Sequence, residues 1–386
     1  MDSVAVPIAA RNAHTALETA FTIAGRVSAL RAQGRDIADL SIGEPDLPTP
    51  DFIVEAGLRA LAAGATRYGP PAGLPALRAA IAAAAGADAA DVFVTPGAKA
   101  AMLYSLLVAI DPGDEVLVPD PGFPPYRSQV RLAGGVPVPY RLARSSGFAL
   151  TAGAIAGAIT PRSRAIIVND PGNPAGGALD AAEGDAIAEL AARHGLLVLS
   201  DEIYAPFAGD TPRRIPTASI MVNALSKSHR MTGWRLGWAV VPSSHREAYE
   251  RIVVNAHSCV APFVQLAAVA AIERGDAAVR DHARELELRR QRLAGELDRI
   301  PGIRCPVPDG GFYAFPDCAA LLRTLGVDDA ELARRLLDEA GVATIAGSSF
   351  GENGRGHLRL SLAASRPVLE TALERIAHFA TLRLRT

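Results

Sequence analysis

The chain has 386 residues, a length that favours two domains over a single hydrophobic core. Its composition, 49% hydrophobic and 21% charged with a formal net charge of −2, excludes a disordered chain and a polyanion-binding protein. The basic residues form no run of five or more, so we expect no nucleic-acid partner.

The predicted elements begin with a helical pattern at residues 17–34, followed by an irregular, proline-rich segment at 41–50. From residue 91 onward, short apolar runs alternate with helical patterns. The predicted strands are 91–95, 115–119, 165–168, 196–200, 219–225 and 234–241. The predicted helices between them are 98–110, 124–135 and 180–195. Continuous apolar runs separated by helices indicate strands buried on both faces, so we predict an α/β fold with an open, mostly parallel sheet.

The pattern changes after about residue 275. A long charged helix is predicted at 280–300, and strand-like runs at 312–315 and 357–362 alternate with two helical patterns. This second pattern is typical of a smaller α+β domain, with which we expect the N-terminal helix to pack. We therefore predict a large domain at 45–274 and a small domain made of 1–44 and 275–386.

The chain carries no sign of export or membrane insertion. Its first ten residues contain an acid where a signal peptide has basic residues. The most apolar stretch, 258–272, is interrupted by Pro262 and Gln265 and is too short to span a bilayer. Three cysteines without CxxC spacing indicate neither disulfides nor a zinc site. We expect a soluble, cytoplasmic protein without a bound metal.

Candidate site residues follow five of the predicted strands. They are Gly97 at the start of a helix, Phe123, Asn173, Asp201 with Tyr204, and Ser226 with Lys227. Ligands bind beyond the carboxyl ends of the strands in open α/β sheets, and a helix N-terminus binds phosphate. Each residue alone also suits a structural role, as a cap, turn or core residue, but five at one edge indicate a site.

Lys227 is one of only two lysines, beside 37 arginines. A guanidinium stays protonated, whereas a lysine amine of lowered pKa can form a Schiff base with an aldehyde. A phosphate site, an aromatic face, an acid and an amine together suit pyridoxal phosphate, whose ring nitrogen would pair with Asp201. We therefore predict pyridoxal phosphate as the cofactor.

Seven segments, in order and over nearly the whole chain, carry a family resemblance. They are IGEPDLPTP, TRYGPPAGLPALRAAIA, VTPGAKAA, NPAGG, SDEIY, SKSHRMTGWRLGW and GHLRLSLA. With these segments the chain resembles the class I/II aminotransferases, the fold type I pyridoxal-phosphate enzymes. The resemblance implies a large domain with a seven-stranded-type sheet and helices on both faces. It also implies transfer of an amino group from an L-amino acid to a 2-oxo acid.

The resemblance also implies roles for the residues that hold and use the cofactor. Lys227 would form the Schiff base and move the substrate Cα proton, and Asp201 would pair with the pyridinium nitrogen. Tyr204 and Asn173 would bond the phenolic oxygen of the cofactor, and Phe123 would stack on its ring.

The phosphate and the substrate carboxylate have their own implied ligands. The phosphate ligands would be the backbone N–H groups of Ala98 and Lys99, the side chains of Ser226 and Arg235, and Tyr68 of the neighbouring subunit. The last of these implies a homodimer with shared active sites. Arg359 would bind the substrate α-carboxylate bidentately, assisted by Asn173 and the backbone of Gly43.

Some positions depart from the family pattern. His229 and Arg230, just after the predicted Schiff-base lysine, differ from the residues usual in the family at these positions. We expect an exposed structural role for both. The Lys99 side chain is expected to be solvated. We find no second arginine for a dicarboxylic substrate, and Phe123, Phe350 and Ile23 favour a neutral or apolar amino acid.

The sequence also bears on four alternative functions. A C–S β-lyase on the same fold stays open, because nearly the same residues serve both reactions. The G-x-S-x-G pattern around Ser349 is expected not to be a hydrolase nucleophile, because a glycine-rich loop follows it where a helix is required. A dehydrogenase is disfavoured because no G-x-G-x-x-G opens a helix. A non-enzymatic regulator is disfavoured because the predicted catalytic residues are all present.

Overall fold

The computed structural model describes residues 8–9, 12, 15, 18–208, 215 and 219–384. Its largest feature is a seven-stranded sheet in the order β2-β8-β7-β6-β5-β3-β4. The strands are β2 (Val92–Thr95), β8 (Gly237–Val240), β7 (Ser219–Ala224), β6 (Leu197–Asp201), β5 (Ser163–Asn169), β3 (Glu115–Asp120) and β4 (Val136–Arg141). Only β8 runs antiparallel to its two neighbours, so the predicted mostly parallel α/β sheet is confirmed.

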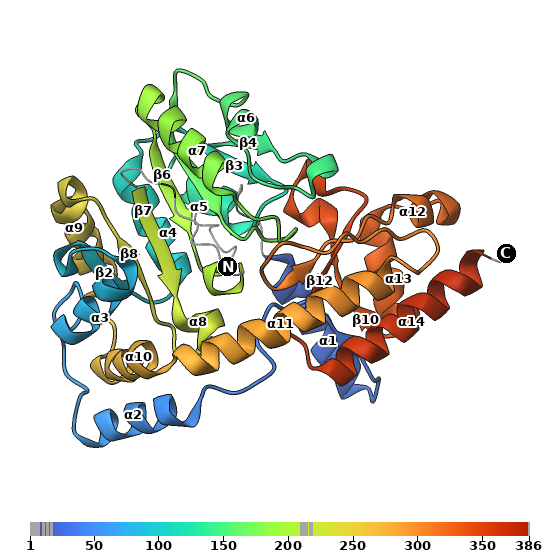
Figure 1. The fold of residues 1–386 in the computed structure, drawn as a ribbon, viewed down its shortest axis with the longest axis horizontal. Helices are drawn as coiled ribbons and strands as arrows, with labels where there is room; N and C mark the ends of the chain where they lie inside the picture. The colour runs from blue at the N-terminus through green and yellow to red at the C-terminus, as the bar shows by residue number, and fades with distance from the viewer. Residues whose placement is uncertain are drawn as a thin grey trace, which may run out of the picture.

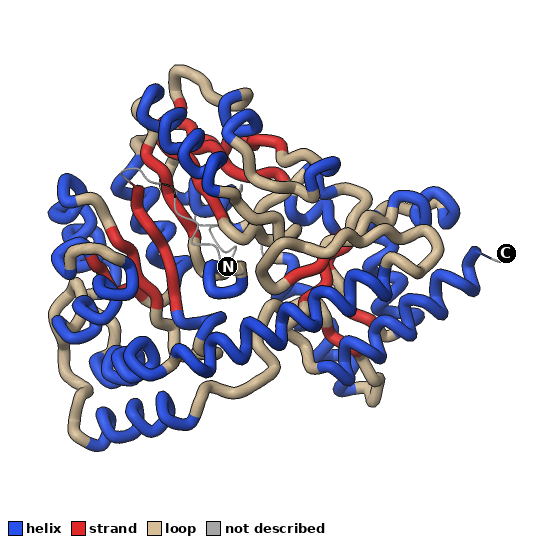
Figure 2. The backbone as a smooth tube through the Cα atoms, in the orientation of Figure 1, coloured by secondary structure: helices blue, strands red, loops and turns tan. Residues whose placement is uncertain are grey.

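Helices cover both faces of this sheet (Figures 1 and 2). Along β3, Val116 and Val118 pack with α4 (Ala98–Ala109), α5 (Pro125–Leu132) and α9 (Arg246–His257). Leu117, between them, packs on the other face with α6 (Ala152–Ala156) and α7 (Ala181–His194). Successive side chains of a strand point to opposite faces, so a continuous apolar run contributes to two cores at once.

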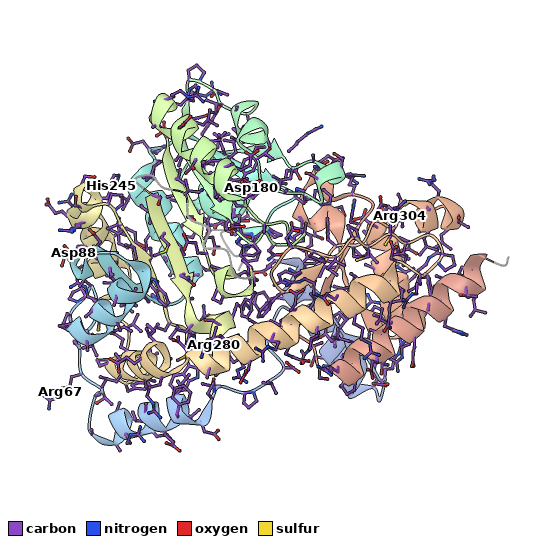
Figure 3. All side chains as sticks on the ribbon, in the orientation of Figure 1. Arg67, Asp88, Asp180, His245, Arg280 and Arg304 are labelled. Atoms are coloured by element: carbon purple, nitrogen blue, oxygen red, sulfur yellow. The ribbon has the colours of Figure 1, made fainter. Side chains whose placement is uncertain are left out.

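Two features of the large sheet bear on the sequence patterns. Asp180, labelled in Figure 3, caps α7, part of the helix predicted at 180–195, by accepting a hydrogen bond from the Glu183 N–H at 2.8 Å. The seventh strand, β4, was not among the predicted strands because Pro137 and Pro139 interrupt its pattern. It lies at the edge of the sheet, where a strand tolerates residues that cannot donate a backbone hydrogen bond.

Three helices that were not predicted pack against the β2 end of the sheet. They are α2 (Asp51–Ala62), α3 (Pro75–Ala85) and α10 (Pro262–Arg274). The short helix α8 (Leu225–Ser228) follows β7 directly and carries Lys227. No helix in the described part of the chain is long and apolar enough to cross a membrane.

The remaining elements surround two small sheets. The strands are β1 (Ala38–Asp39) with β10 (Val342–Ala343), and β11 (Ile345–Ala346), β12 (Leu358–Ser361) and β9 (Tyr313–Ala314). The helices are α1 (Thr19–Ala32), α11 (Asp276–Leu297), α12 (Ala319–Leu325), α13 (Asp329–Ala340) and α14 (Arg366–Leu384). In Figure 1, α11 extends from α10 and α8 beside the large sheet to these small sheets. The predicted domain boundaries, at 44/45 and 274/275, stay a prediction.

Candidate active site

A cavity of about 590 Å³ lies where the carboxyl ends of the parallel strands face the small sheets. Of the twelve residues to which the family resemblance assigns cofactor or substrate contacts, eleven line it: Gly43, Ala98, Lys99, Phe123, Asn173, Asp201, Tyr204, Ser226, Lys227, Arg235 and Arg359. The twelfth, Tyr68, lies outside it with 90% of its surface exposed. The described residues contain no group of three or more His, Cys, Asp or Glu that could hold a metal ion.

One end of the cavity is a candidate phosphate site. Gly97, with φ of 89°, turns the chain from β2 into α4, whose first N–H groups have no acceptor within the helix. A side chain at Gly97 would place its Cβ 2.5 Å from Nη2 of Arg235, so only glycine lets the loop approach this guanidinium. Arg235 donates to the Thr232 carbonyl at 2.7 Å, which fixes its charge beside the helix N-terminus.

At the other end, Asp201 is a buried acid with two donors. The Tyr126 hydroxyl donates to its Oδ2 at 2.7 Å, and the Ile203 N–H donates to its Oδ1 at 3.2 Å. Burial raises the pKa of the Asp201 carboxyl, and these two hydrogen bonds oppose that rise. Tyr126 was not singled out from the sequence, because its place on α5 gives no local sign of this contact.

A pair of buried phenols also lines the cavity. The hydroxyls of Tyr204 and Tyr313 are 2.9 Å apart. The pKa of Tyr204 is raised well above its ordinary value, chiefly by burial and next by the neighbouring Tyr313. A side chain at Gly43 would collide with the Tyr313 hydroxyl, so the loop that carries Gly43 passes directly over this phenol.

Arg359, on β12, is held at the cavity wall with only 3% of its surface exposed. It donates to the Ser41 carbonyl at 2.5 Å and to Oδ1 of Asn173 at 3.2 Å. Its guanidinium carbon lies 4.2 Å from the ring centroid of Tyr313 and 5.0 Å from that of Phe350. Its Nε is buried and has no hydrogen-bond partner. A buried guanidinium with an unused donor at a cavity is suited to an anionic ligand.

The Lys227 amine donates to the Gly43 carbonyl. Burial lowers the pKa of this amine to about 8, although the Glu44 carboxylate acts in the opposite direction. A lysine near this pKa is partly neutral at physiological pH, which a nucleophile and proton carrier requires.

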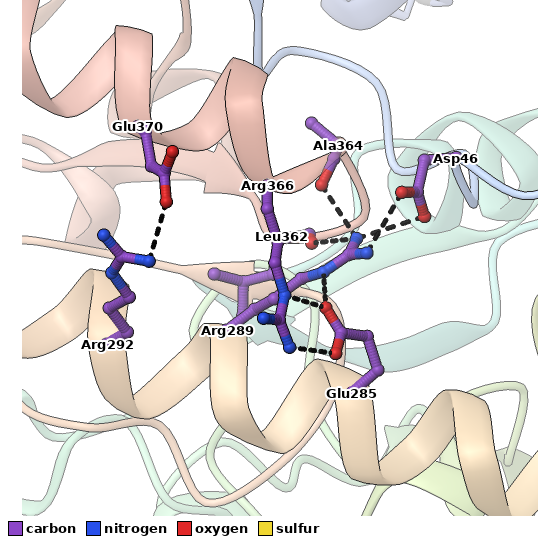
Figure 4. A network of polar contacts seen from close by, with 8 residues as sticks. All are labelled: Asp46, Glu285, Arg289, Arg292, Leu362, Ala364, Arg366 and Glu370. Carbon is purple, nitrogen blue, oxygen red and sulfur yellow. Dashed lines mark hydrogen bonds and ion pairs between the residues drawn. The ribbon is translucent and has the colours of Figure 1, made fainter.

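The loop that carries Gly43 is anchored by Arg289 of α11 (Figure 4). Arg289 binds both carboxylate oxygens of Asp46, at 3.0 and 3.1 Å, and donates to the Ala364 carbonyl at 2.8 Å. It also binds Glu285, whose pKa is lowered to about 2 by Arg366 and Arg289. One guanidinium thus ties the loop to the chain segment that follows the Arg359 strand.

Lys99 is not simply solvated, contrary to expectation. Its amine forms an ion pair with Glu18, the residue that precedes α1, and lies 5.4 Å from the ring of Phe21 and 5.3 Å from that of Phe123. Glu18 and Phe21 also line the cavity. Both were missed, because only the tertiary fold brings α1 to this position.

The expectation of an exposed role for His229 and Arg230 was wrong in part. Both are partly buried, and neither lines the cavity. Nδ1 of His229 lies 2.8 Å from the Ser228 hydroxyl, and burial lowers the pKa of the ring to about 4. Phe350 and Ile23, expected near the substrate, do not line the cavity either. Ser349 lies in a 3₁₀ turn (Gly347–Phe350) with no α-helix directly after it, in agreement with the prediction for that motif.

The donor set fits the predicted cofactor. A helix N-terminus and Arg235 suit a phosphate, Asp201 suits a protonated ring nitrogen, and the Lys227 amine lies in the same cavity.

Comparison with known proteins agrees with this fit. Residues 35–376 match the family described as aminotransferase class I and II. An aspartate aminotransferase of Geobacillus stearothermophilus is 37% identical, covering 96% of this chain and 98% of its own. An arginine–pyruvate transaminase of Pseudomonas aeruginosa is also 37% identical, covering 93% of each chain. The solved structure of aspartate aminotransferase from Thermus thermophilus with maleate superposes with a TM-score of 0.91 at 34% identity, covering 97% of this chain and 100% of that one.

Proposed function

The chain belongs to the class I and II aminotransferases, which depend on pyridoxal phosphate, and from that premise we propose which residues perform each part of the reaction. The observation that carries the proposal is the single cavity that brings together the Lys227 amine, the Asp201 carboxylate, the phosphate site and Arg359. The enzyme moves the amino group of an L-amino acid to a 2-oxo acid.

The two ends of the cavity hold the cofactor. When bound, pyridoxal phosphate supplies an aldehyde that condenses with an amine and a protonated ring that withdraws electrons from the substrate Cα. The N–H groups of Ala98 and Lys99, with Ser226 and Arg235, bind its phosphate. Asp201 keeps the ring nitrogen protonated, and the Tyr126 hydroxyl keeps Asp201 ionised and oriented.

The wall of the cavity orients the ring and its phenolic oxygen. Phe123 would cover the ring, and Tyr204 and Asn173 would bond the phenolic oxygen. Oδ1 of Asn173 already accepts from Arg359, so its amide NH₂ is left to donate. The hydrogen bond between the Tyr204 and Tyr313 hydroxyls holds the Tyr204 hydroxyl in place.

Lys227 carries the proton. Its lowered pKa would let the neutral amine take the proton from the substrate Cα and carry it to the former aldehyde carbon of the cofactor. The Gly43 carbonyl, which accepts from this amine, directs it within the cavity. Arg359 binds the substrate α-carboxylate, and its fixed guanidinium places the Cα–H bond beside the amine.

We also propose that the enzyme is a homodimer in which Tyr68 reaches the phosphate of the partner's site. Tyr68 is 90% exposed, and the adjoining helices expose Leu58, Leu61 and Leu266. An apolar surface of this kind is typical of a protein–protein interface. The cysteines Cys259, Cys305 and Cys318 are free, which agrees with a cytoplasmic location.

Replacement of Lys227 tests the chemistry. Lys227→Ala and Lys227→Arg should each lower turnover by at least about a thousandfold, because neither side chain offers a neutral amine. Both should lose the absorbance of covalently bound cofactor. Normal turnover in either variant would contradict the assignment. Release of ammonia and a 2-oxo acid without an added acceptor would instead indicate the lyase.

Subunit mixing tests the shared site. Tyr68→Ala and Lys227→Ala place their defects in different subunits of one site, so mixing the two variants should restore about a quarter of the wild-type sites. No recovery on mixing, with exchange of subunits verified by mass, would contradict the shared site.

A further inference from the structure

We propose that this enzyme takes amino donors whose side chain carries no carboxylate, because Glu18 is ion-paired with Lys99, the one cation among the described cavity residues that the cofactor and the α-carboxylate leave for a second carboxylate. The inference rests on the proposed function and specifies the substrate class of that site.

The cations of the cavity can be counted among the residues that the structure describes. Four line it: Lys99, Lys227, Arg235 and Arg359. In the proposed function three of them are engaged, Lys227 with the cofactor and the Cα proton, Arg235 with the phosphate, and Arg359 with the α-carboxylate. Lys99 is the remaining cation among the described cavity residues of this chain, so it is the one that a side-chain carboxylate could bind there.

Lys99 already has an anionic partner. Its amine is ion-paired with Glu18, whose side chain is 19% exposed. Glu18 immediately precedes α1, where the positive end of the helix dipole favours a carboxylate. Glu18 is therefore stabilised in this place by two positive partners, and a substrate carboxylate would have to displace it.

The surroundings of the pair do not favour a second carboxylate either. The rings of Phe21 and Phe123 lie 5.4 and 5.3 Å from the Lys99 amine, and Glu44 adds another carboxylate to the cavity wall. Lys99 and Glu18 line the same cavity as Lys227, and their opposite charges are paired with one another. Because the charges of Lys99 and Glu18 are paired, they do not repel a neutral, aromatic or basic side chain of a substrate.

The Lys99 side chain is 45% exposed, and ion pairs of this kind are weak, so removing Glu18 should change binding by about tenfold rather than by many orders of magnitude. The test is equilibrium binding, by calorimetry, of succinate and butyrate to the enzyme loaded with pyridoxal phosphate. The wild type should bind butyrate at least as tightly as succinate. Glu18→Gln should tighten succinate binding by about tenfold and change butyrate binding less than about twofold.

A double-mutant cycle assigns the gain to Lys99. Adding Lys99→Met to Glu18→Gln should return succinate binding to the wild-type value, because the freed amine is then gone. Glu247→Gln is the matched control, because it removes a similar ion pair, with Arg251, on the exposed surface of α9. It should change the binding of neither succinate nor butyrate. An equal gain in Glu247→Gln, or a gain that survives Lys99→Met, would overturn the proposal.

If Glu18→Gln does not fold, measurements on the wild type alone still test the proposed substrate class. Succinate binding more than about tenfold tighter than butyrate, or faster single-turnover conversion of aspartate than of leucine, would overturn the proposal. If no amino acid converts the bound cofactor, the proposed function fails. The binding of succinate and butyrate would still show whether Lys99 can bind a second carboxylate.

Discussion

The inner wall of the cavity and its mouth are built in different ways. On the inner wall, Asp201 and Arg359 are 7% and 3% exposed, and each is held by at least two hydrogen bonds. At the mouth, Phe21 is 67% exposed, and Lys99 is held to α1 by one ion pair and its contact with that ring. We infer that the two parts have different roles. The inner wall holds the groups that act on every donor in fixed positions, whereas the groups at the mouth, which distinguish one donor from another, can change without disturbing the fold.

The largest effect after the loss of Lys227 should come from Arg359→Lys on the inner wall. An ammonium cannot bind a carboxylate bidentately, and it would leave the Ser41 carbonyl and Asn173 without their donor. We expect kcat/KM for every amino donor to fall about 100-fold, measured by steady-state transamination. Arg292→Lys, on the exposed surface of α11, is the matched control and should be silent. An effect of Arg359→Lys confined to one donor class would assign Arg359 to the side chain of the substrate.

The lowered pKa of Lys227 predicts that the rate of cofactor attachment changes about tenfold with pH. Attachment of pyridoxal phosphate to the apoenzyme requires the neutral amine, whose population rises as the pH passes upward through its pKa of about 8. The rate of attachment, followed by absorbance, should therefore rise about tenfold from pH 7 to pH 9 and level off above. A rate that still rises tenfold per pH unit above pH 9 would mean that burial does not lower this pKa.

A smaller effect, about fivefold in kcat, is expected for Tyr126→Phe. The Tyr126 hydroxyl donates to Asp201 and opposes the effect of burial, so its removal should raise the pKa of Asp201. Asp201 would then take up a proton at a higher pH, and the acidic limb of the pH–rate profile should move upward. Tyr140→Phe is the matched control, since that buried hydroxyl donates to the Ile167 carbonyl. A profile shifted equally by both variants would reflect general destabilisation.

The two parts of the cavity also differ in how far the sequence predicts them. Asp201, Asn173 and Lys227 could be found because they follow strands, whose apolar runs are visible in the chain and whose ends meet at one edge. Tyr126 and Glu18 could not be found in this way, since Tyr126 lies on a helix, Glu18 immediately precedes one, and each contact depends on how that helix packs. The β4 strand escaped for the opposite reason, because its alternating prolines conceal the strand pattern.

The smallest effect should come from Phe21→Ala at the mouth. Phe21 is 67% exposed, so its loss removes little core packing, but its ring lies beside Lys99 at the cavity wall. We expect KM to rise about threefold for donors with large apolar side chains, through lost contact area, with kcat unchanged. Leu288→Ala, which truncates a 52% exposed side chain of α11 away from the cavity, should leave both constants unchanged. A fall in kcat for all donors would show that the mouth, like the inner wall, positions the reacting groups, and the division between the two would then fail.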